Sequence, residues 1–374
     1  YFWKRNQEES AMAAIFTMSI VQSALELGCI YALVAIALYI SFTLLNIADL
    51  STDGCFTLGC AVGAMVTLAG HPILAFFAAM AAGVCSGFVT AFLQTKMGVP
   101  SILAGIIVNT GLYTVNLAVM GFSSNINLYS CDRLFSMAKE ISDNEIYRDW
   151  YEFGIVLAIV LVVCLALAWL LGTRLGLSIR AIGDNEHMVK ASSINPGRMI
   201  TAGLCISGSL TALSGAVLGQ YQKSCDINFG TGQVTIALAS LVIGNTLIRK
   251  GGMFRRILGV VLGSCLYRFI AAFALRLSLP AESMKLVSAV IVAAAIALPY
   301  LKEKAGLTQR KLRGEDDKSA GRRYAADGKS MRAGRDRRMR STGKISGIRN
   351  ADGSEENKRS NSMWGGADCR KTGE

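Results

Sequence analysis

Apolar residues fill long runs along most of the chain, and short polar stretches separate these runs. A helix needs roughly 20 mostly apolar residues to cross about 30 Å of hydrocarbon. The candidate stretches are residues 23–46, 54–70, 72–95, 99–121, 152–172, 199–219, 231–248, 257–276 and 284–301. This pattern predicts an all-α, polytopic membrane protein with about 8–10 transmembrane helices.

The composition agrees with a membrane protein. Of the 374 residues, 52% are hydrophobic and only 17% are charged. So many apolar residues exclude a disordered chain, because disordered chains are poor in apolar residues. Ten cysteines in a chain of this length also exclude a small disulfide-bonded scaffold.

Three segments differ in composition. Residues 1–22 form an N-terminal segment whose apolar part either extends the first helix or lies at the membrane interface. Residues 23–301 form the transmembrane domain. Residues 302–374 carry 20 of the 38 Lys and Arg residues and show almost no apolar periodicity. We therefore expect this last segment to be a disordered basic tail.

The tail also explains most of the formal net charge of +12. Because the basic charge lies in a segment without a core, it does not indicate a folded nucleic-acid-binding domain. We expect a lipid membrane and no specific nucleic acid as partners. Attraction of the tail to anionic lipid or RNA stays open.

Lys and Arg residues in short loops set the orientation of a membrane protein. Loops 173–198 and 249–256 and the tail are all basic, and the order of the spans can place them on one side. We expect this side to be the cytoplasm, with the protein in the cell (plasma) membrane. The side on which the chain begins stays open.

No catalytic or metal centre is expected. His71 and His187 are the only histidines, so a histidine-based metal cluster is implausible. The cysteines form no CxxC pair, and most of them lie within apolar spans, where a thiol behaves as a small hydrophobe. Cys131 and Cys225 fall in two predicted outer loops and are either unpaired or joined to each other.

Carboxylates and amides within predicted spans mark candidate functional sites, because polar groups at membrane depth are costly. Asn46, Asp49 and Asp53 interrupt an apolar region. They lie either in a tight loop or in an unwound stretch that lines a cavity. Asp53 can also cap the helix that starts near Gly54.

Further polar side chains occur in later spans. Asn109 and Asn116 lie seven residues apart on one helix face, and each lines a pathway or hydrogen-bonds a neighbouring helix. Arg268, near the middle of its span, is expected either to form a buried ion pair or to face a pore. The candidate pathway residues are Asn46, Asp49, Asp53, Asn109 and Asn245.

Loop 173–198 predicts two helices beneath the membrane. One runs from residue 186 to about 192, with Asp184 or Asn185 as its cap, and the other starts at Pro196. Together they form a compact knob that suits docking to a soluble partner. The alternative is a structured loop without a partner.

Several motifs have a familiar order along the chain. They are Gly28–Ala35 (GCIYALVA), Arg180–Asn185 (RAIGDN), Ser193–Asn195 (SIN), Ser207–Ser209, Leu213–Ala216 (LSGA), Gly230–Gly232 (GTG), Ala237–Ala239 and Ile243–Gly244. The ensemble resembles the permease subunits of bacterial ABC importers of the branched-chain amino acid and ribose type, over roughly residues 20–300. Ala48–Gly59 resembles a little-characterised subgroup linked in some members to aromatic amino acids such as tryptophan.

The resemblance implies a transmembrane permease that forms the pathway for a small solute, with an amino acid as the expected class. Such permeases form homodimers or heterodimers, bind a separate ABC ATPase and receive solute from an extracytoplasmic binding protein. The positions that match the ATPase-coupling region are Arg180, Gly183, Asp184, Asn185, Asn195 and Gly197. Ser192 and Ser193 depart from the family, which often has Gly there.

The resemblance also implies no cofactor in this subunit, because a partner hydrolyses ATP, and it implies no enzymatic chemistry. Gly328–Ser330 ends like a phosphate-binding loop, but Arg323 stands where the motif requires Gly. A self-contained secondary transporter is the alternative function. It requires ion-coupling carboxylates in mid-span and two similar halves, and no clear repeat is visible.

Overall fold

A computed structural model describes residues 18–129, 131, 133–136, 150–192, 194–248 and 252–276, and single positions between 286 and 297. Contacts divide the chain into Tyr1–Lys302 and Glu303–Glu374. The expected disordered tail and the expected span 284–301 lie outside the described residues, apart from those single positions.

The described chain is built almost entirely from helices. In chain order these are α2 (Met18–Leu38), the π-helix η1 (Tyr39–Leu44), α3 (Thr52–Leu68), α4 (Pro72–Thr95), α5 (Ser101–Val119), α7 (Tyr151–Gly172), α8 (Arg174–Asp184), α9 (Glu186–Ala191), α10 (Pro196–Gln222), α11 (Gln233–Leu247) and α12 (Met253–Arg276). Strands β1 (Asn125–Asn127) and β2 (Ser224–Asp226) pair antiparallel, with Ile126 opposite Cys225. The predicted all-α class is confirmed.

The helices have the length and composition of membrane spans. Six elements are long and apolar enough to cross a bilayer, and they correspond to α2 with η1, α4, α5, α7, α10 and α12. Helices α3 and α11 are apolar but shorter. The chain is therefore a multi-pass membrane protein, and these eight helices fall on the first eight predicted spans.

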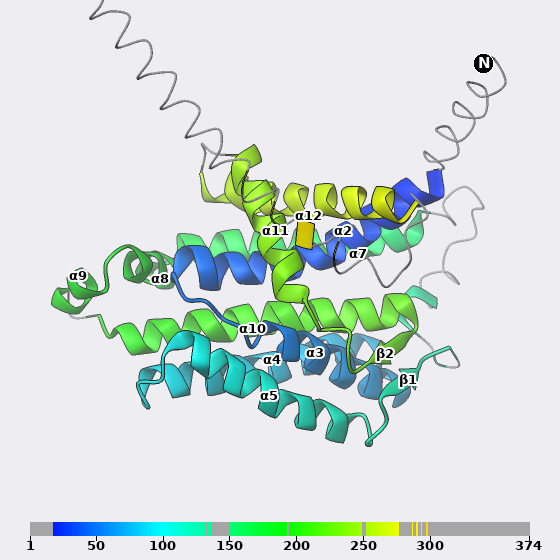
Figure 1. The fold of residues 1–374 in the computed structure, drawn as a ribbon, viewed down its shortest axis with the longest axis horizontal. Helices are drawn as coiled ribbons and strands as arrows, with labels where there is room; N and C mark the ends of the chain where they lie inside the picture. Colours follow the sequence, from blue (N-terminus) through cyan, green and yellow to red (C-terminus); the bar gives the residue numbers. More distant parts are fainter. Residues whose placement is uncertain are drawn as a thin grey trace, which may run out of the picture. The chain divides into compact units, whose positions relative to one another are not determined.

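Helix α10 lies at the centre of the bundle and packs mainly against α4, α3 and α2 (Figure 1). Small residues bring the backbones together. A Cβ on Gly59 of α3 would overlap the carbonyl oxygen of Ala212, and a Cβ on Gly83 of α4 would overlap that of Gly208. Close backbone approach maximises van der Waals contact, which drives helix association in membranes.

Two hydrogen bonds to α10 fix the direction of α3 and its position along α10. The Cys55 thiol donates to the Gly208 carbonyl at 3.3 Å, and Gln220 Nε2 donates to Thr67 Oγ1 at 3.1 Å. In both hydrogen bonds the residue of α10 lies 153 positions after its partner in α3, so the two helices run parallel. The first residue of α3 is level with Cys205, about 14 Å along α10. Helix α3 therefore begins inside the bundle.

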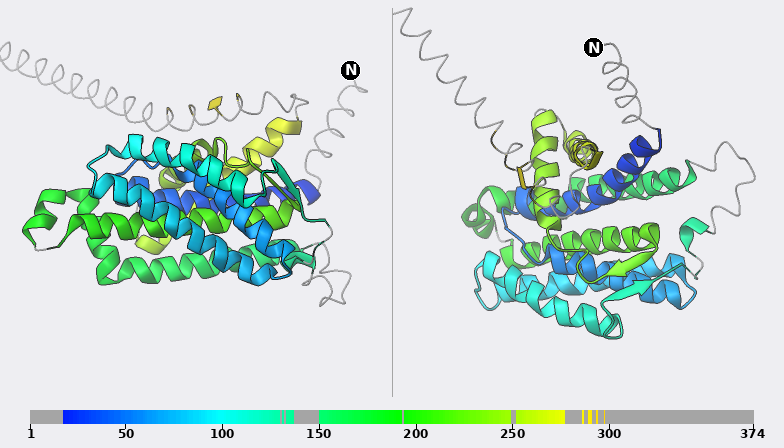
Figure 2. Two further views of the ribbon diagram at one scale, coloured as in Figure 1. Left: turned by 90° about the horizontal axis from the view of Figure 1, so that it is seen from below. Right: turned by 45° about the vertical axis from the view of Figure 1, so that its right-hand side comes forward.

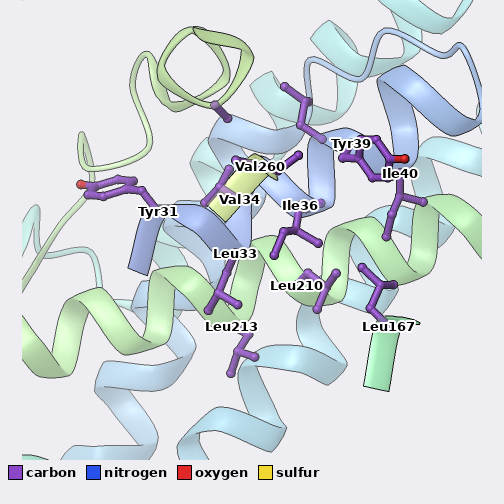
Figure 3. Packing of buried hydrophobic residues seen from close by; sticks show 14 of the residues in the cluster. Tyr31, Leu33, Val34, Ile36, Tyr39, Ile40, Leu167, Leu210, Leu213 and Val260 are labelled. Atoms are coloured by element: carbon purple, nitrogen blue, oxygen red, sulfur yellow. The ribbon is translucent and has the colours of Figure 1, made fainter. Parts of the chain in front are cut away.

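Helix α2 forms the main apolar core with α7, α10 and α12. Every residue from Cys29 of α2 to Ile40 of η1 is buried, as expected for a helix that is apolar on every side. Figure 3 shows Leu33 and Ile36 of α2 near Leu210 and Leu213 of α10. Helices α4, α5 and α7 instead expose large apolar side chains, such as Phe77, Ile107 and Trp169, as lipid-facing helices do.

Helices α8 and α9 lie at one end of the bundle, and β1 and β2 lie at the other (Figures 1 and 2). The start of α12 is at the α8 end, because Tyr39 donates its hydroxyl proton to the Met253 sulfur at 3.5 Å. The structure therefore brings loop 173–198 and residues 253–256 of the other basic loop to the same end.

The predicted helices near residues 186 and 196 are confirmed. Asn185 caps α9 by accepting from the Met188 amide at 3.2 Å, and Asn195 caps α10, which begins at Pro196. Asp184 is instead the last residue of α8, a helix that the sequence analysis did not predict. Cys131 and Cys225 are both free, so the pairing alternative is not realised.

The close contact of α3 with α10 predicts the effect of a single methyl group. Gly59→Ala should lower the free energy of unfolding by about 1–3 kcal/mol, because the helices must separate to admit the Cβ. Gly154→Ala on α7 is the matched control, since no atom lies within 4 Å of its Cβ position. Thermal unfolding of both variants in detergent tests this expectation, and equal stability of the two would contradict it.

Candidate functional site

The beginnings of two helices meet inside the bundle at Asp53. This residue lies in the first turn of α3, and its carboxylate accepts the backbone N–H of Gly232 at 3.0 Å and that of Val234 at 2.8 Å. Gly232 is the N-cap position of α11. Asp53 therefore caps α11 and not its own helix, which corrects the sequence-based expectation.

A re-entrant segment, residues 227–232, makes this meeting possible. It follows β2 and runs back into the bundle, where the Gly230 amide donates to Thr57 Oγ1 at 3.1 Å. A Cβ on Gly230 would overlap the carbonyl oxygen of Asp53, so only glycine permits this approach. Helix α11 then crosses the direction of α10 steeply (Figures 1 and 2). The predicted full span 231–248 is thus a shorter helix that starts inside the protein.

Asp49 holds the turn of the chain that directly precedes α3. It is 5% exposed, and its Oδ1 accepts the Ser51 amide at 2.9 Å and the Ser51 hydroxyl at 2.6 Å. Asn46 precedes it in a left-handed conformation with a φ of 56°, directly after η1. Short π-helical turns of this kind are frequent at functional sites. The interruption of the apolar region is therefore a structured, non-helical stretch from residue 45 to residue 51.

A polar cavity of about 190 Å³ lies where α3, α5 and the re-entrant segment meet. It is lined by Asp53, Gly54, Thr57, Asn109, Thr110, Tyr113, Asn116, Ile227, Gly230 and Thr231. The Asn109 side chain covers Gly54, with Oδ1 2.7 Å from the position a Cβ would take. No lysine or arginine belongs to this lining.

The cavity brings together two of the candidate pathway residues, Asp53 and Asn109. Asn46, Asp49 and Asn245 do not belong to its lining. Asn46 is exposed, and Asn245 is half-buried near the end of α11. The structure thus separates the candidates into cavity residues and residues that shape the chain around it.

Asn116 is the second asparagine of the α5 pair and also lines the cavity. It is 1% exposed, and its Nδ2 donates to the Gly54 carbonyl at 3.1 Å. Its Oδ1 is buried and has no hydrogen-bond partner. The seven-residue spacing indicated that it shares a face with Asn109. The hydroxyls of Thr57, Tyr113 and Thr231 gave no such signal, because single hydroxyls are common in apolar helices.

Arg268 has an aromatic partner. Its guanidinium carbon lies 3.5 Å from the centroid of the Tyr31 ring, and this ring stacks on Phe56 with centroids 6.0 Å apart. A cation over an aromatic face is attracted by the ring quadrupole. Among the described residues, Arg268 therefore contacts an aromatic face, and this contact fastens α12 to α2.

Helices α8 and α9 form an arm at one end of the bundle (Figure 1). Gly176, Ile179 and Ile182 face inward, while Leu175 and Leu177 are 53% and 60% exposed. On α9, Met188 is 71% exposed. Exposed large apolar side chains beyond the membrane spans suit a protein interface.

The candidate coupling residues occupy different parts of this arm. Arg180, Asp184, Asn185 and Asn195 are exposed, and Gly197 is half-buried in the first turn of α10. Gly183 packs against the end of η1, where a Cβ would overlap the carbonyl oxygen of Leu44. The arm therefore contacts the element that leads directly into the stretch 45–51.

The cap on α11 can be tested by substitution of Asp53. Asp53→Ala leaves two amides without their acceptor and should lower the free energy of unfolding by about 1–3 kcal/mol. Asp53→Asn keeps one acceptor oxygen and should lower it less. Asp226→Ala is the control, because this half-buried carboxylate accepts a hydrogen bond from the Asn228 amide within a local turn. Thermal unfolding in detergent is the measurement, and an equal loss for Asp53→Ala and Asp226→Ala would refute the capping role.

Comparison with known proteins identifies relatives of this chain. A tyrosine transport system permease protein of Clostridioides difficile (strain R20291) is 33% identical over 296 residues, covering 79% of this chain and 96% of that protein. The ribose import permease protein RbsC of Escherichia coli (strain K12) is 25% identical over 303 residues, covering 77% and 88%. An inward-facing metal-chelate type ABC transporter structure has a TM-score of 0.41 at 18% identity and covers 76% and 85%, a likeness too distant for further argument.

The family model described as "Branched-chain amino acid transport system / permease component" matches residues 20–296. This range contains every described helix except the first two residues of α2. The relatives above are transport permeases and not enzymes. The chain therefore belongs to the branched-chain amino acid transport permease family and is a permease of the ABC transporter type.

Proposed function

We propose that this chain forms the translocation pathway for a small amino acid solute in an ATP-driven importer. The observation that carries the proposal is the polar cavity at the junction of α3, α5 and the start of α11. Interrupted helices whose ends meet inside a membrane bundle are a recurrent way to build solute sites. The tyrosine transport permease relative supports an amino acid as the solute.

The energy comes from partner subunits. A separate ABC ATPase docks on the arm formed by α8 and α9, with Leu175, Leu177 and Met188 as its apolar contacts and Arg180 and Asp184 as its polar ones. This end of the bundle faces the cytoplasm, and the basic tail follows on the same side. An extracytoplasmic binding protein delivers solute at the β1 and β2 end, and two permeases assemble as a homodimer or heterodimer.

The contact of Gly183 with Leu44 links the arm to the cavity. From Leu44 the chain passes through residues 45–51 into the first turn of α3, where Asp53 holds the start of α11. A displacement of α8 is therefore transmitted to the end of η1 and to the cavity wall. ATP binding and hydrolysis in the partner change the population of arm positions, and so switch access to the cavity.

The first experiment is a pull-down of the full chain from detergent-solubilised native membranes, with mass spectrometry as the readout. A stoichiometric ATPase and a co-purifying binding protein are the expected result. A known ABC complex from the same membranes is the positive control. Recovery of this chain alone while the control complex stays intact would favour a self-contained secondary transporter.

Transmission through Gly183 can be separated from docking of the ATPase. Gly183→Ala should preserve ATPase co-purification but reduce ATP-driven uptake about 10-fold or more, because the added methyl group displaces α8 from η1. Gly172→Ala is the matched control, since no atom lies within 4 Å of its Cβ position. Uptake of radiolabelled L-tyrosine into proteoliposomes that contain the ATPase and the binding protein is the measurement.

Docking itself is tested by Asp184→Ala and Gly197→Trp. Each should weaken ATPase co-purification, because Asp184 is exposed on the arm and a large side chain at Gly197 enlarges the start of α10. Intact association and uptake in both variants would overturn the coupling assignment.

A further inference from the structure

One polar atom in the cavity wall has no hydrogen-bond partner. Asn116 Oδ1 is buried without a partner, while Nδ2 of the same amide donates to the Gly54 carbonyl. This hydrogen bond fixes the amide orientation, because a flipped amide would place two acceptors against each other. A buried acceptor without a donor is unfavourable, and such groups in folded proteins call for a specific explanation.

The charge of the cavity wall selects among possible donors. The starts of α3 and α11 carry partial positive charge, which alone would favour an anion. Asp53 already satisfies the start of α11, since each of its carboxylate oxygens accepts one amide. The carboxylate charge roughly balances the half charges of the two helix termini, so the wall does not favour an anion. Among its described residues, the lining has no basic side chain, and Asp53 is its one charged side chain.

We infer that the cavity binds solutes through a primary ammonium group, which donates to Asn116 Oδ1 beside the Asp53 carboxylate. This inference rests on the proposed function and adds a recognition rule to it: the solute class is an amine or the ammonium pole of a zwitterion. Asn116 is then a residue that determines specificity. The fixed Oδ1 supplies direction, and the carboxylate supplies the charge preference.

A series of probe ligands, added to the wild-type complex, tests which charged group of the solute the cavity recognises. The chain with its ATPase, in lipid nanodiscs and without the binding protein, is titrated with tyramine, L-tyrosine, 3-(4-hydroxyphenyl)propanoate, N,N,N-trimethyltyramine and D-ribose by ligand-observed NMR. Tyramine and L-tyrosine should bind at least 10-fold more tightly than the other three. The trimethyl probe keeps the positive charge but has no N–H donor, so it separates charge from hydrogen bonding.

Two substitutions of Asn116 separate ligand recognition from structure. Asn116→Leu removes the acceptor, and the affinity for tyramine should fall about 10- to 100-fold. Asn116→Asp loses the Nδ2 donor to Gly54 but keeps an acceptor, so the preference for ammonium should persist. A purely structural asparagine would instead show equal losses in both variants. Thr114→Val, on an exposed position of the same helix, is the control.

Several outcomes would overturn the inference. If the propanoate or D-ribose bound as tightly as tyramine, the cavity would not recognise an ammonium group. If the propanoate bound more tightly than tyramine, the cavity would be a site for anions. Unchanged tyramine affinity in Asn116→Leu would exclude Oδ1 as the acceptor. ATPase co-purification by the wild-type chain is scored in the same preparations, so a failure of the proposed function is distinguishable from a failure of ammonium recognition.

Discussion

The structure depends on one carboxylate that joins two helix beginnings inside the bundle. Without Asp53, two amides at the start of α11 would lose their acceptor, and unsatisfied amides are costly at membrane depth. Because Asp53 belongs to α3, it fixes the position of the re-entrant segment against α3, and both line the cavity. The same group that permits an interrupted helix thereby shapes the site that the interruption creates.

Small residues provide the rigid frame around this junction. Gly59 and Gly83 bring α3 and α4 into backbone contact with α10, and Gly215 of α10 approaches Phe56 in the same way. A frame held by close backbone contact yields little, whereas the stretch 45–51 lies between η1 and α3 and belongs to neither. Motion that arrives at Leu44 is therefore expected to concentrate in this stretch and in the first turn of α3.

Much of the fold could be predicted from the sequence, because apolar runs reflect the bilayer directly. The helix starts at 186 and 196 were also predictable, since Asn185, Asn195 and Pro196 are local end signals. The steep course of α11 and the starting level of α3 were not. They depend on Asp53 and Gly230 meeting across nearly 180 residues, as the offset of 179 between Asp53 and Gly232 shows. Spacing along one helix carries no information about such a contact.

The candidate site shows the same division between local and distant information. Sequence analysis selected Asp53 and Asn109 because polar groups in apolar spans are rare, and both line the cavity. The same rule selected Asp49, whose Oδ1 accepts two hydrogen bonds from Ser51 in a local turn. The rarity of polar side chains in apolar spans identifies groups that need hydrogen-bond partners. The structure is needed to show which of these groups have no partner. In the part of the chain that the structure describes, Asn116 meets both conditions, since its Oδ1 lies buried in the cavity wall without a donor. An ammonium group in the cavity would supply that donor and also face the charge of Asp53.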